Sequence, residues 1–226
     1  MATFVLIPGG WHGGWAFAGM IARLRQAGHE AYALTLPGLD ETPPEDAAPI
    51  NLDTHIADVL EFLSIEDLSE VVLCSHSYGG MVARGVADRA ADRIAALIYL
   101  DAFVPDDGQS WWDLANDHYR RIVIERARHD GLTVLPPEGR DPRRRPHPLG
   151  AFLQALHLTR AEPAIRRVFV YASGWSATPF TAQYERLRDD PAWSVHSIDC
   201  AHDLINVASD AVFDILTGTA RELALP

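Results

Sequence analysis

The chain contains no lysine, so all 19 of its basic residues are arginines. This absence excludes lysine-dependent mechanisms, including the phosphate-binding lysine of a P-loop. Against 31 acidic residues, the formal net charge is −12, and the sequence pI is about 5.2. A protein this acidic lacks the basic footprint with which proteins bind nucleic acids or anionic membranes, so we expect neither as a partner.

The chain is also poor in cysteine and in long apolar runs. Its two cysteines, Cys74 and Cys200, stand far apart beside strand-like runs. We expect two buried free thiols rather than a disulfide, as is usual in a reducing cytoplasm. No segment approaches the ~18 apolar residues that a membrane span requires. The N-terminal MATFVLIPGG has no basic region before its short apolar run, so it predicts a strand and not a signal peptide. The sequence therefore predicts a soluble, cytoplasmic protein.

Strand-like and helix-like runs alternate along the 226 residues, which fit a single domain over 1–226. The strand-like runs are 4–7, 31–36, 71–75, 94–100, 167–172 and 193–198. The helix-like runs outside the central insertion are 15–26, 52–63, 81–91 and 210–223. This alternation predicts an α/β fold, with a mostly parallel sheet and helices on both of its faces.

Residues 103–165 interrupt the alternation. The segment has many prolines and no strand signal, and its helix-like pieces are 111–128 and 149–158. An insertion of this size between two strands predicts a cap over the edge of the sheet, where substrate selection usually resides. The run Arg143-Arg144-Arg145 inside it is interpreted as a solvated loop rather than an anion site.

The most informative window is VVLCSHSYGGM, residues 71–81. An apolar run ends in Ser75-His76-Ser77-Tyr78-Gly79, and a helix-like run follows directly. A strand, a tight turn with serine at its tip and a helix form a nucleophile elbow, where small residues must flank the serine. Ser75 and Gly79 satisfy that requirement, with serine in place of the usual first glycine. The window predicts Ser77 as a nucleophile; the alternative is a glycine-rich turn with an inert serine.

A serine nucleophile needs a histidine base and an acid that orients the base. In a parallel sheet, catalytic groups gather beyond the C-terminal ends of the strands. Of the ten histidines, His202 has such a position, after the last predicted strand. His76 neighbours Ser77 but is expected to point away from it. His12 could line the pocket, and His196 alternates within a strand and is expected to be exposed.

The acid is the difficult member of the site. The strand that follows the elbow helix delivers Asp101 directly at its end, in the chain order serine, aspartate, histidine. The loop after the penultimate strand has no carboxylate before Glu185, which falls within the next helix. We therefore expect Asp101 to be the acid. The alternatives are that Asp101 only caps a turn, that Asp203 or Asp199 is the acid, or that water completes a dyad.

Two backbone amides are expected to form an oxyanion hole. One is the amide of Tyr78, after the nucleophile. The other is expected from the loop PGGWHGG, residues 8–14, whose glycines let the backbone approach a substrate closely; we choose Gly10, beside Trp11. The loop lacks G-x-G-x-x-G and a following lysine, so it is no phosphate site. No cluster of histidine, cysteine and aspartate has metal-ligand spacing, so we predict no metal and no cofactor.

Five segments carry a resemblance to known proteins: FVLIPGGWHGGWAF, LDTHIADVLEFL, VVLCSHSYGGMV, LIYLDAFVPDDGQS and DCAHD. They resemble the α/β-hydrolase superfamily, and within it the group of hydroxynitrile lyases, plant methylesterases and their bacterial esterase relatives. The resemblance implies a parallel-sheet fold with a small cap. It also implies that Ser77 is the nucleophile, that His202 is the base, and that Gly10 and Tyr78 supply the oxyanion amides.

Two of the departures of this chain from the group bear on the chemistry. Many relatives place the acid after the penultimate strand, and the matching position here is near Ser176, which favours Asp101. In the lyases, a lysine just after the catalytic histidine helps to hold cyanide. Here Asp203 follows His202, so cyanohydrin cleavage is not expected.

The leading hypothesis is a serine hydrolase, a carboxylesterase, that cleaves an ester of a small apolar or aromatic molecule through an acyl-enzyme on Ser77. Candidate pocket residues, each of which could equally belong to the core, are Trp11, His12, Phe103, Trp111, Trp112 and Trp175. One alternative is a natural-product tailoring enzyme that uses the same site for lactonisation, elimination or cyclisation. A second is a catalytically silent, ligand-binding protein on a hydrolase fold. The expected partner is a small-molecule substrate, and the oligomeric state stays open, with a homodimer as one alternative.

Overall fold

The computed structural model describes residues 1–40, 49–129, 131–138, 141–160 and 165–224. In this part of the chain, six strands form one sheet in the order β2-β1-β3-β4-β7-β8, and every neighbouring pair is parallel. The strands are β1 (Thr3–Ile7), β2 (Glu30–Ala33), β3 (Val71–His76), β4 (Ile94–Leu100), β7 (Arg166–Ala172) and β8 (Trp193–Ile198). The predicted α/β fold is confirmed.

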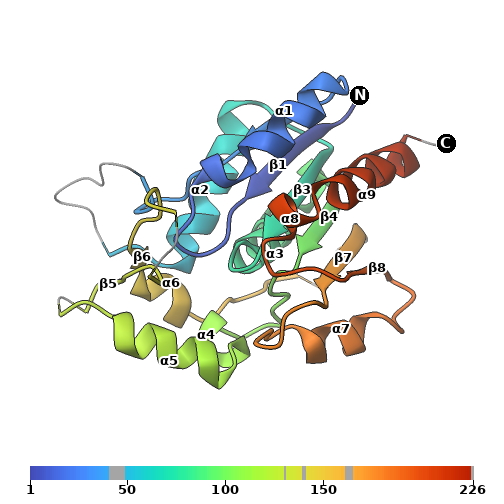
Figure 1. Ribbon diagram of the computed structural model, residues 1–226. Coiled ribbons are helices and arrows are strands. Elements are labelled where there is room, and N and C mark those ends of the chain that lie inside the picture. The colour runs from blue at the N-terminus through green and yellow to red at the C-terminus, as the bar shows by residue number, and fades with distance from the viewer. Residues whose placement is uncertain (41–48, 130, 139–140, 161–164, 225–226) are drawn as a thin grey trace.

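Helices cover both faces of this sheet (Figure 1). One face packs against α1, α8 and α9, and the other against α2 and α3. Outside the segment between β4 and β7, the helices are α1 (Ala18–Gln26), α2 (Leu52–Ile65), α3 (Gly79–Arg89), α7 (Thr181–Leu187), α8 (Leu204–Val207) and α9 (Ser209–Leu223).

Strand β3 shows why the central strands are mostly apolar. Val72 and Cys74 pack with the helices of one face, whereas Val71 and Leu73 pack with those of the other. Successive side chains of a strand point to opposite faces, so a strand with helices on both sides buries every residue. All six residues of β3 are buried, and the strand lies inside the sheet between β1 and β4.

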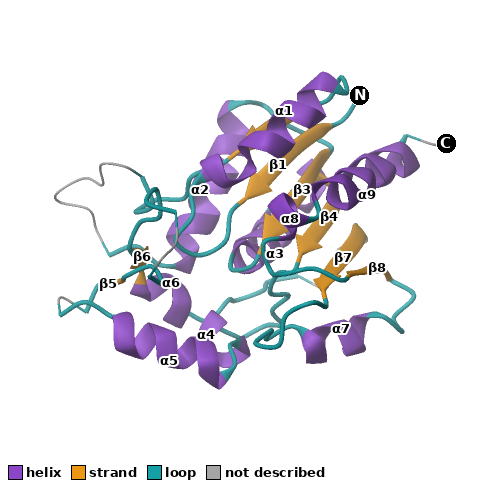
Figure 2. Cartoon of the chain, in the orientation of Figure 1, coloured by secondary structure: helices purple, strands orange, loops and turns teal. Residues whose placement is uncertain are grey.

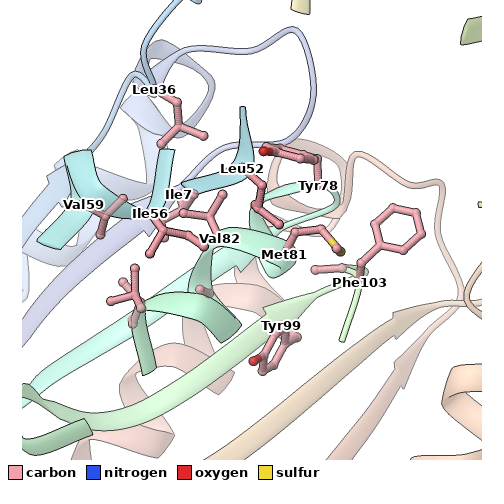
Figure 3. Packing of buried hydrophobic residues seen from close by; sticks show 14 of the residues in the cluster. Ile7, Leu36, Leu52, Ile56, Val59, Tyr78, Met81, Val82, Tyr99 and Phe103 are labelled. Atoms are coloured by element: carbon pink, nitrogen blue, oxygen red, sulfur yellow. The ribbon is translucent and has the colours of Figure 1, made fainter. Parts of the chain in front are cut away.

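The packing between α2 and α3 fixes the helix that follows the elbow. Ile56 of α2 and Val82 of α3 meet in a cluster that also holds Ile7 of β1 (Figure 3). A Cβ on Gly85 would lie 2.3 Å from the end of the Ile56 side chain, so glycine leaves room for that side chain in its present position. The Asn51 side chain caps α2 by accepting from the Thr54 N–H.

The segment between β4 and β7 lies on the side to which the strand arrowheads point (Figure 2). The prediction that it lacks strands is wrong, because Thr133–Val134 pairs with His147–Pro148. Two-residue strands are too short to show an alternating pattern. The elements of the segment are α4 (Trp111–Leu114), α5 (Asp117–Arg126), β5 (Thr133–Val134), β6 (His147–Pro148) and α6 (Leu149–Leu153).

Two helices predicted in this segment are also corrected. The helix predicted over 111–128 is broken, because Ala115 and Asn116 are extended and the Asn116 side chain caps a new helix by accepting from the Tyr119 N–H. The helix predicted over 149–158 ends at Leu153. The backbone of Leu156 pairs with that of residues 108 and 109 instead of continuing the helix.

Other element boundaries shift by a few residues. The strand predicted over 31–36 ends at Ala33, because its neighbour β1 ends before Pro8, which has no N–H to donate. The helix predicted over 81–91 begins at Gly79, directly after the elbow, and ends at Arg89. The first turn of the helix predicted over 15–26 is a 3₁₀ turn, Gly14–Phe17.

The two cysteines are free thiols. Cys74 is buried in β3, as predicted, but the prediction of burial is wrong for Cys200, which is half-buried just after β8 at the edge of the sheet. In the described residues, no helix combines the length and the apolar character that a membrane crossing needs.

Candidate active site

Ser77 lies at the tip of a strained turn between β3 and α3. Its φ angle is +54°, in the left-handed region that residues other than glycine rarely occupy. A Cβ on Gly79 would lie 2.7 Å from the carbonyl oxygens of Ile7 and Pro8. The glycine is therefore required by the close approach of helix and strand that the sequence pattern predicts. At the position of the usual first glycine, the Ser75 hydroxyl is buried and donates to the Ile98 carbonyl oxygen at 3.4 Å.

Asp101 and His202 form a close pair. The distance from His202 Nδ1 to Asp101 Oδ2 is 2.7 Å. Asp101 is fully buried at the end of β4, with φ +44°. The Ala172 N–H donates to its other carboxylate oxygen at 3.1 Å. Of the three candidate acids, it is Asp101 that contacts the imidazole, whereas Asp203 and Asp199 are exposed.

Burial raises the pKa of the Asp101 carboxyl, because a buried charge loses its hydration. The Ala172 N–H and the nearby Trp175 indole oppose this rise in pKa. The geometry of the indole N–H is too poor for a regular hydrogen bond. When ionised, the carboxylate only accepts hydrogen bonds, so it holds the His202 proton on Nδ1 and leaves Nε2 as the basic nitrogen.

His202 packs against three aromatic rings, of which that of Phe180 stacks on it with centroids 5.8 Å apart. The His76 ring lies 4.5 Å from that of His202 between centroids, and a contact of 3.0 Å joins His76 Nε2 to the His202 carbonyl oxygen. The Trp175 ring lies 4.8 Å away. His76 was expected only to point away from Ser77, and its support of His202 is a contact that the sequence did not predict. His196 is exposed, as predicted.

Ser77 and His202 line one small cavity of about 20 Å³. Of the predicted pocket residues, Trp11, Phe103 and Trp111 line it. The rest of its wall is mostly aromatic and includes residues that the sequence reasoning missed: Tyr119, Phe152, Pro179 and Phe180. These residues come from the segment between β4 and β7 and from the loop before α7. In these irregular segments, no local sequence pattern indicates which side chains face the cavity.

Three predicted pocket residues do not line this cavity. Trp112 is half-buried beside the Arg120 guanidinium, 6.0 Å from its ring centroid. Trp175 covers His202 from outside the cavity. His12 lines a separate polar cleft with Arg143 and Asp203.

The amides chosen for the oxyanion hole both belong to residues that line the cavity. Neither the Gly10 nor the Tyr78 N–H has a hydrogen-bond acceptor among the described residues. Tyr78 also stands just before the N-terminus of the 11-residue helix α3, whose dipole favours negative charge there. The arrangement is thus suited to stabilising an oxyanion formed beside Ser77.

Behind the cavity wall lie two buried histidines that sequence position did not single out. His55 is bound to the Tyr78 hydroxyl at 2.8 Å and to the Pro37 carbonyl oxygen at 3.0 Å. The His147 ring stacks on Phe152 with centroids 4.2 Å apart. Burial lowers the pKa of His55 to about 4 and that of His147 well below its usual value, so both imidazoles are neutral.

The arginine run 143–145 was interpreted as a solvated loop, which is wrong for the half-buried Arg145 and for Arg144. Its guanidinium is half-buried and donates to His12 Nε2 at 3.0 and 2.8 Å. Arg143 is exposed, pairs with Asp141 and lies 4.2 Å over the Trp15 ring. Within the described ranges, no group of three or more histidine, cysteine, aspartate or glutamate side chains is placed to hold a metal ion.

The chain is similar in sequence to known esterases. A carbendazim hydrolyzing esterase from a Nocardioides species is 36% identical over 227 residues, covering 91% of this chain and 94% of that protein. Methylesterase 7 from Arabidopsis thaliana is 36% identical over 107 residues, a match that covers 46% of this chain and 40% of the plant protein.

Similarity of fold extends over the whole molecule. The structure of an extracellular α/β-hydrolase from a Paenibacillus species has a TM-score of 0.81 with this chain, at 20% sequence identity, and the match covers 97% of this chain and 99% of that one. Residues 4–224 match the alpha/beta hydrolase family. The chain therefore belongs to the α/β-hydrolase family, as its five sequence segments predicted.

Proposed function

We propose that this protein is a carboxylesterase that cleaves an ester of a small apolar or aromatic molecule through an acyl-enzyme on Ser77. The observation that carries the proposal is the pair formed by His202 and Asp101, 2.7 Å apart, beside a cavity that His202 shares with Ser77. Esterase relatives, one of them similar over nearly the whole chain, confirm the predicted class of carboxylic ester hydrolase.

The proposed reaction has two halves. The Ser77 hydroxyl attacks the ester carbonyl carbon while His202 takes its proton, and the Gly10 and Tyr78 amides stabilise the negative oxygen of the tetrahedral intermediate. The C–O bond then breaks, and the alcohol leaves with the proton from His202. Water attacks the acyl-enzyme in the same way and releases the acid. Throughout, Asp101 orients the imidazole and stabilises its protonated form.

The size of the cavity narrows the substrate class. A volume of about 20 Å³ holds about one water molecule. The aromatic walls favour an apolar or planar group, and only a very small acyl group fits without movement of side chains. We therefore expect short acyl esters to be cleaved faster than long ones. We further propose that residues 103–165 act as a cap, since Trp111, Tyr119 and Phe152 of this segment line the cavity.

Covalent labelling tests the proposed nucleophile. After incubation with a fluorophosphonate, the intact mass of the protein is expected to increase by one adduct, and Ser77→Ala is expected to abolish the increase. Ser176→Ala, which removes an exposed serine outside the cavity, is the matched control and is expected to label fully. An adduct that persists on Ser77→Ala would exclude Ser77 as the nucleophile. Product analysis with p-nitrophenyl acetate then distinguishes hydrolysis from transfer or elimination chemistry.

A further inference from the structure

The glycine loop after β1 carries the Gly10 amide of the proposed oxyanion hole, and the loop is strained. Trp11, the next residue, has φ +65°, in the left-handed region that a bulky side chain disfavours. Such a conformation persists only where surrounding contacts hold it. The direction of the Gly10 N–H therefore depends on the groups that bind this loop.

The peptide unit that joins Gly10 to Trp11 is bound at both ends. Its carbonyl oxygen accepts a hydrogen bond from His12 Nδ1 at 2.7 Å. Its N–H, on Trp11, donates to His147 Nδ1 at 3.3 Å. A peptide unit bound through both its C=O and its N–H cannot rotate without breaking two hydrogen bonds. The two histidines thus fix the backbone on the C-terminal side of Gly10.

Arg144 determines which nitrogen of His12 carries the proton. The guanidinium only donates hydrogen bonds, and it donates to His12 Nε2. Nε2 must therefore keep its lone pair, and the proton lies on Nδ1, which faces the Gly10 carbonyl oxygen. Burial and the Arg144 charge lower the pKa of His12 to about 3, so a second proton does not disturb this arrangement near neutral pH.

Further contacts from the same segment hold Trp11 itself. The Arg145 N–H donates to the Trp11 carbonyl oxygen at 3.1 Å, and the Trp11 indole donates to the Val134 carbonyl oxygen at 2.9 Å. Val134, Arg145 and His147 all belong to the segment between β4 and β7. The region that lines the cavity is thus also the region that holds the oxyanion loop.

From these contacts we propose that His147 and Arg144 are positioning residues that hold the Gly10 amide in the oxyanion hole. The inference rests on the proposed esterase function. Under that function, the segment 103–165 both covers the catalytic site and holds one part of it, the oxyanion hole, in place. His147 acts directly on the Trp11 amide, and Arg144 acts through the tautomer of His12.

The burial of His147 argues against a purely structural role. With Nδ1 accepting from Trp11, its proton lies on Nε2, which is buried without a partner among the described residues. Such an unpaired donor costs about 1–3 kcal/mol. A phenylalanine would stack on Phe152 without that cost. Among the described residues, the hydrogen-bond partner of the His147 side chain is the Trp11 amide.

Kinetic measurements on His147 variants test the proposal, because loss of a positioning residue is expected to change kcat and to leave KM nearly unchanged. With p-nitrophenyl acetate, His147→Phe is expected to lower kcat about 10- to 100-fold with little change in KM, because a misplaced donor weakens transition-state binding. His147→Asn keeps an acceptor near the position of Nδ1 and is expected to restore most of kcat. Arg144→Met is expected to lower kcat, and Arg144→Lys, which still donates to Nε2, to retain it. His157→Phe, at an exposed position of the same segment, is the matched control.

Amide hydrogen exchange at Trp11 gives a readout independent of activity. Exchange is expected to be faster in His147→Phe than in the unchanged protein and to slow again in His147→Asn. If the unchanged protein cleaves the ester and His147→Phe keeps its kcat, the inference is overturned while the proposed function stands. If the unchanged protein has no esterase activity, the proposed function fails. In that case, the amide exchange rate at Trp11 still tests the positioning role. An unchanged rate in His147→Phe overturns that role, and a faster rate supports it.

Discussion

At the scale of single residues, Asp101 has the most demanding environment of the site. It is fully buried, its backbone is in the left-handed region, and its two carboxylate oxygens bind different partners. Burial favours the neutral acid, whereas the Ala172 N–H and the imidazole of His202 favour the carboxylate. This balance makes the carboxylate a strong acceptor for one imidazole proton, which is what orientation of a general base requires.

Replacement of that carboxylate is expected to lower kcat strongly. Asp101→Asn retains the shape but offers an amide that can donate to Nδ1 and so hold His202 in the wrong tautomer. By precedent in another triad enzyme, kcat is expected to fall by about 10⁴. Asp203→Asn is the control, because Asp203 is exposed and binds Asn206 rather than His202. The measurement is kcat with p-nitrophenyl acetate. A loss of less than about tenfold would instead indicate a dyad completed by water.

Residues of the site differ in how far sequence could identify them. The turn at Ser77 could be predicted because the elbow is a local pattern, and the positions of His202 and Asp101 could be predicted because both follow predicted strands. The place of His147 beside the glycine loop could not be predicted. Its contact with Trp11 spans 136 residues, and β6, which carries it, has only two residues. Non-local packing inside an irregular segment leaves no periodic signal in the sequence. The prediction that Trp112 and Trp175 line the cavity was wrong for the same reason.

At the scale of elements, the elbow depends on two glycines that open α3. A Cβ on Gly80, its second residue, would lie 2.0 Å from the Phe103 carbonyl oxygen, a backbone atom that cannot move aside cheaply. Phe103 N–H in turn donates to the Ser77 carbonyl oxygen. The start of α3, the elbow and the chain after β4 are thus in direct contact, and the position of Ser77 depends on all three.

A pair of matched substitutions measures this constraint. Gly80→Ala is expected to lower the free energy of unfolding by about 1–3 kcal/mol through steric overlap. Gly19 is also the second residue of its helix, but a Cβ there would meet nothing within 4 Å. Gly19→Ala is therefore expected to raise stability by about 0.5–1 kcal/mol, because alanine favours the helix. Urea unfolding followed by tryptophan fluorescence provides both values. Equal effects of the two substitutions would show that the contact at Gly80 does not constrain the fold.

The strands and helices of the core were predictable for two reasons. Strands buried on both faces are mostly apolar, and the helices that cover the sheet are long enough to show a periodic apolar face. The errors concentrate between β4 and β7. There the Asn116 side chain starts a new helix where apolar spacing alone would continue one, and the Leu156 backbone pairs with another segment. Capping and non-local backbone pairing overrode helix periodicity at these positions.

At the scale of the whole molecule, buried neutral histidines couple folding to pH. Burial, with nearby positive charge in some cases, lowers the pKa of His12 to about 3 and of His55 to about 4, and it lowers those of His76 and His147 well below 6.5. In the unfolded chain these imidazoles would bind protons near pH 6.5. Their contribution to stability is therefore complete above that pH and is lost as pH falls toward the folded-state values. The raised pKa values of Asp58 and Asp101 act in the opposite direction.

Comparison of variants separates these opposing contributions. His55→Leu removes one depressed histidine and leaves both carboxyls, so its stability is expected to fall less steeply with acid than that of the unchanged protein. From a folded pKa of about 4, the difference in unfolding free energy between the two proteins should shrink by about 2 kcal/mol from pH 8 to pH 5. Loss of the His55 contact with the Tyr78 hydroxyl lowers the variant's stability at every pH and so does not affect this change. Urea midpoints at pH 8, 7, 6 and 5 measure it, with the exposed His157→Phe as control. A constant difference across this range would mean that His55 is not held neutral by burial, and the acid sensitivity of the fold would then have to come from the remaining buried imidazoles.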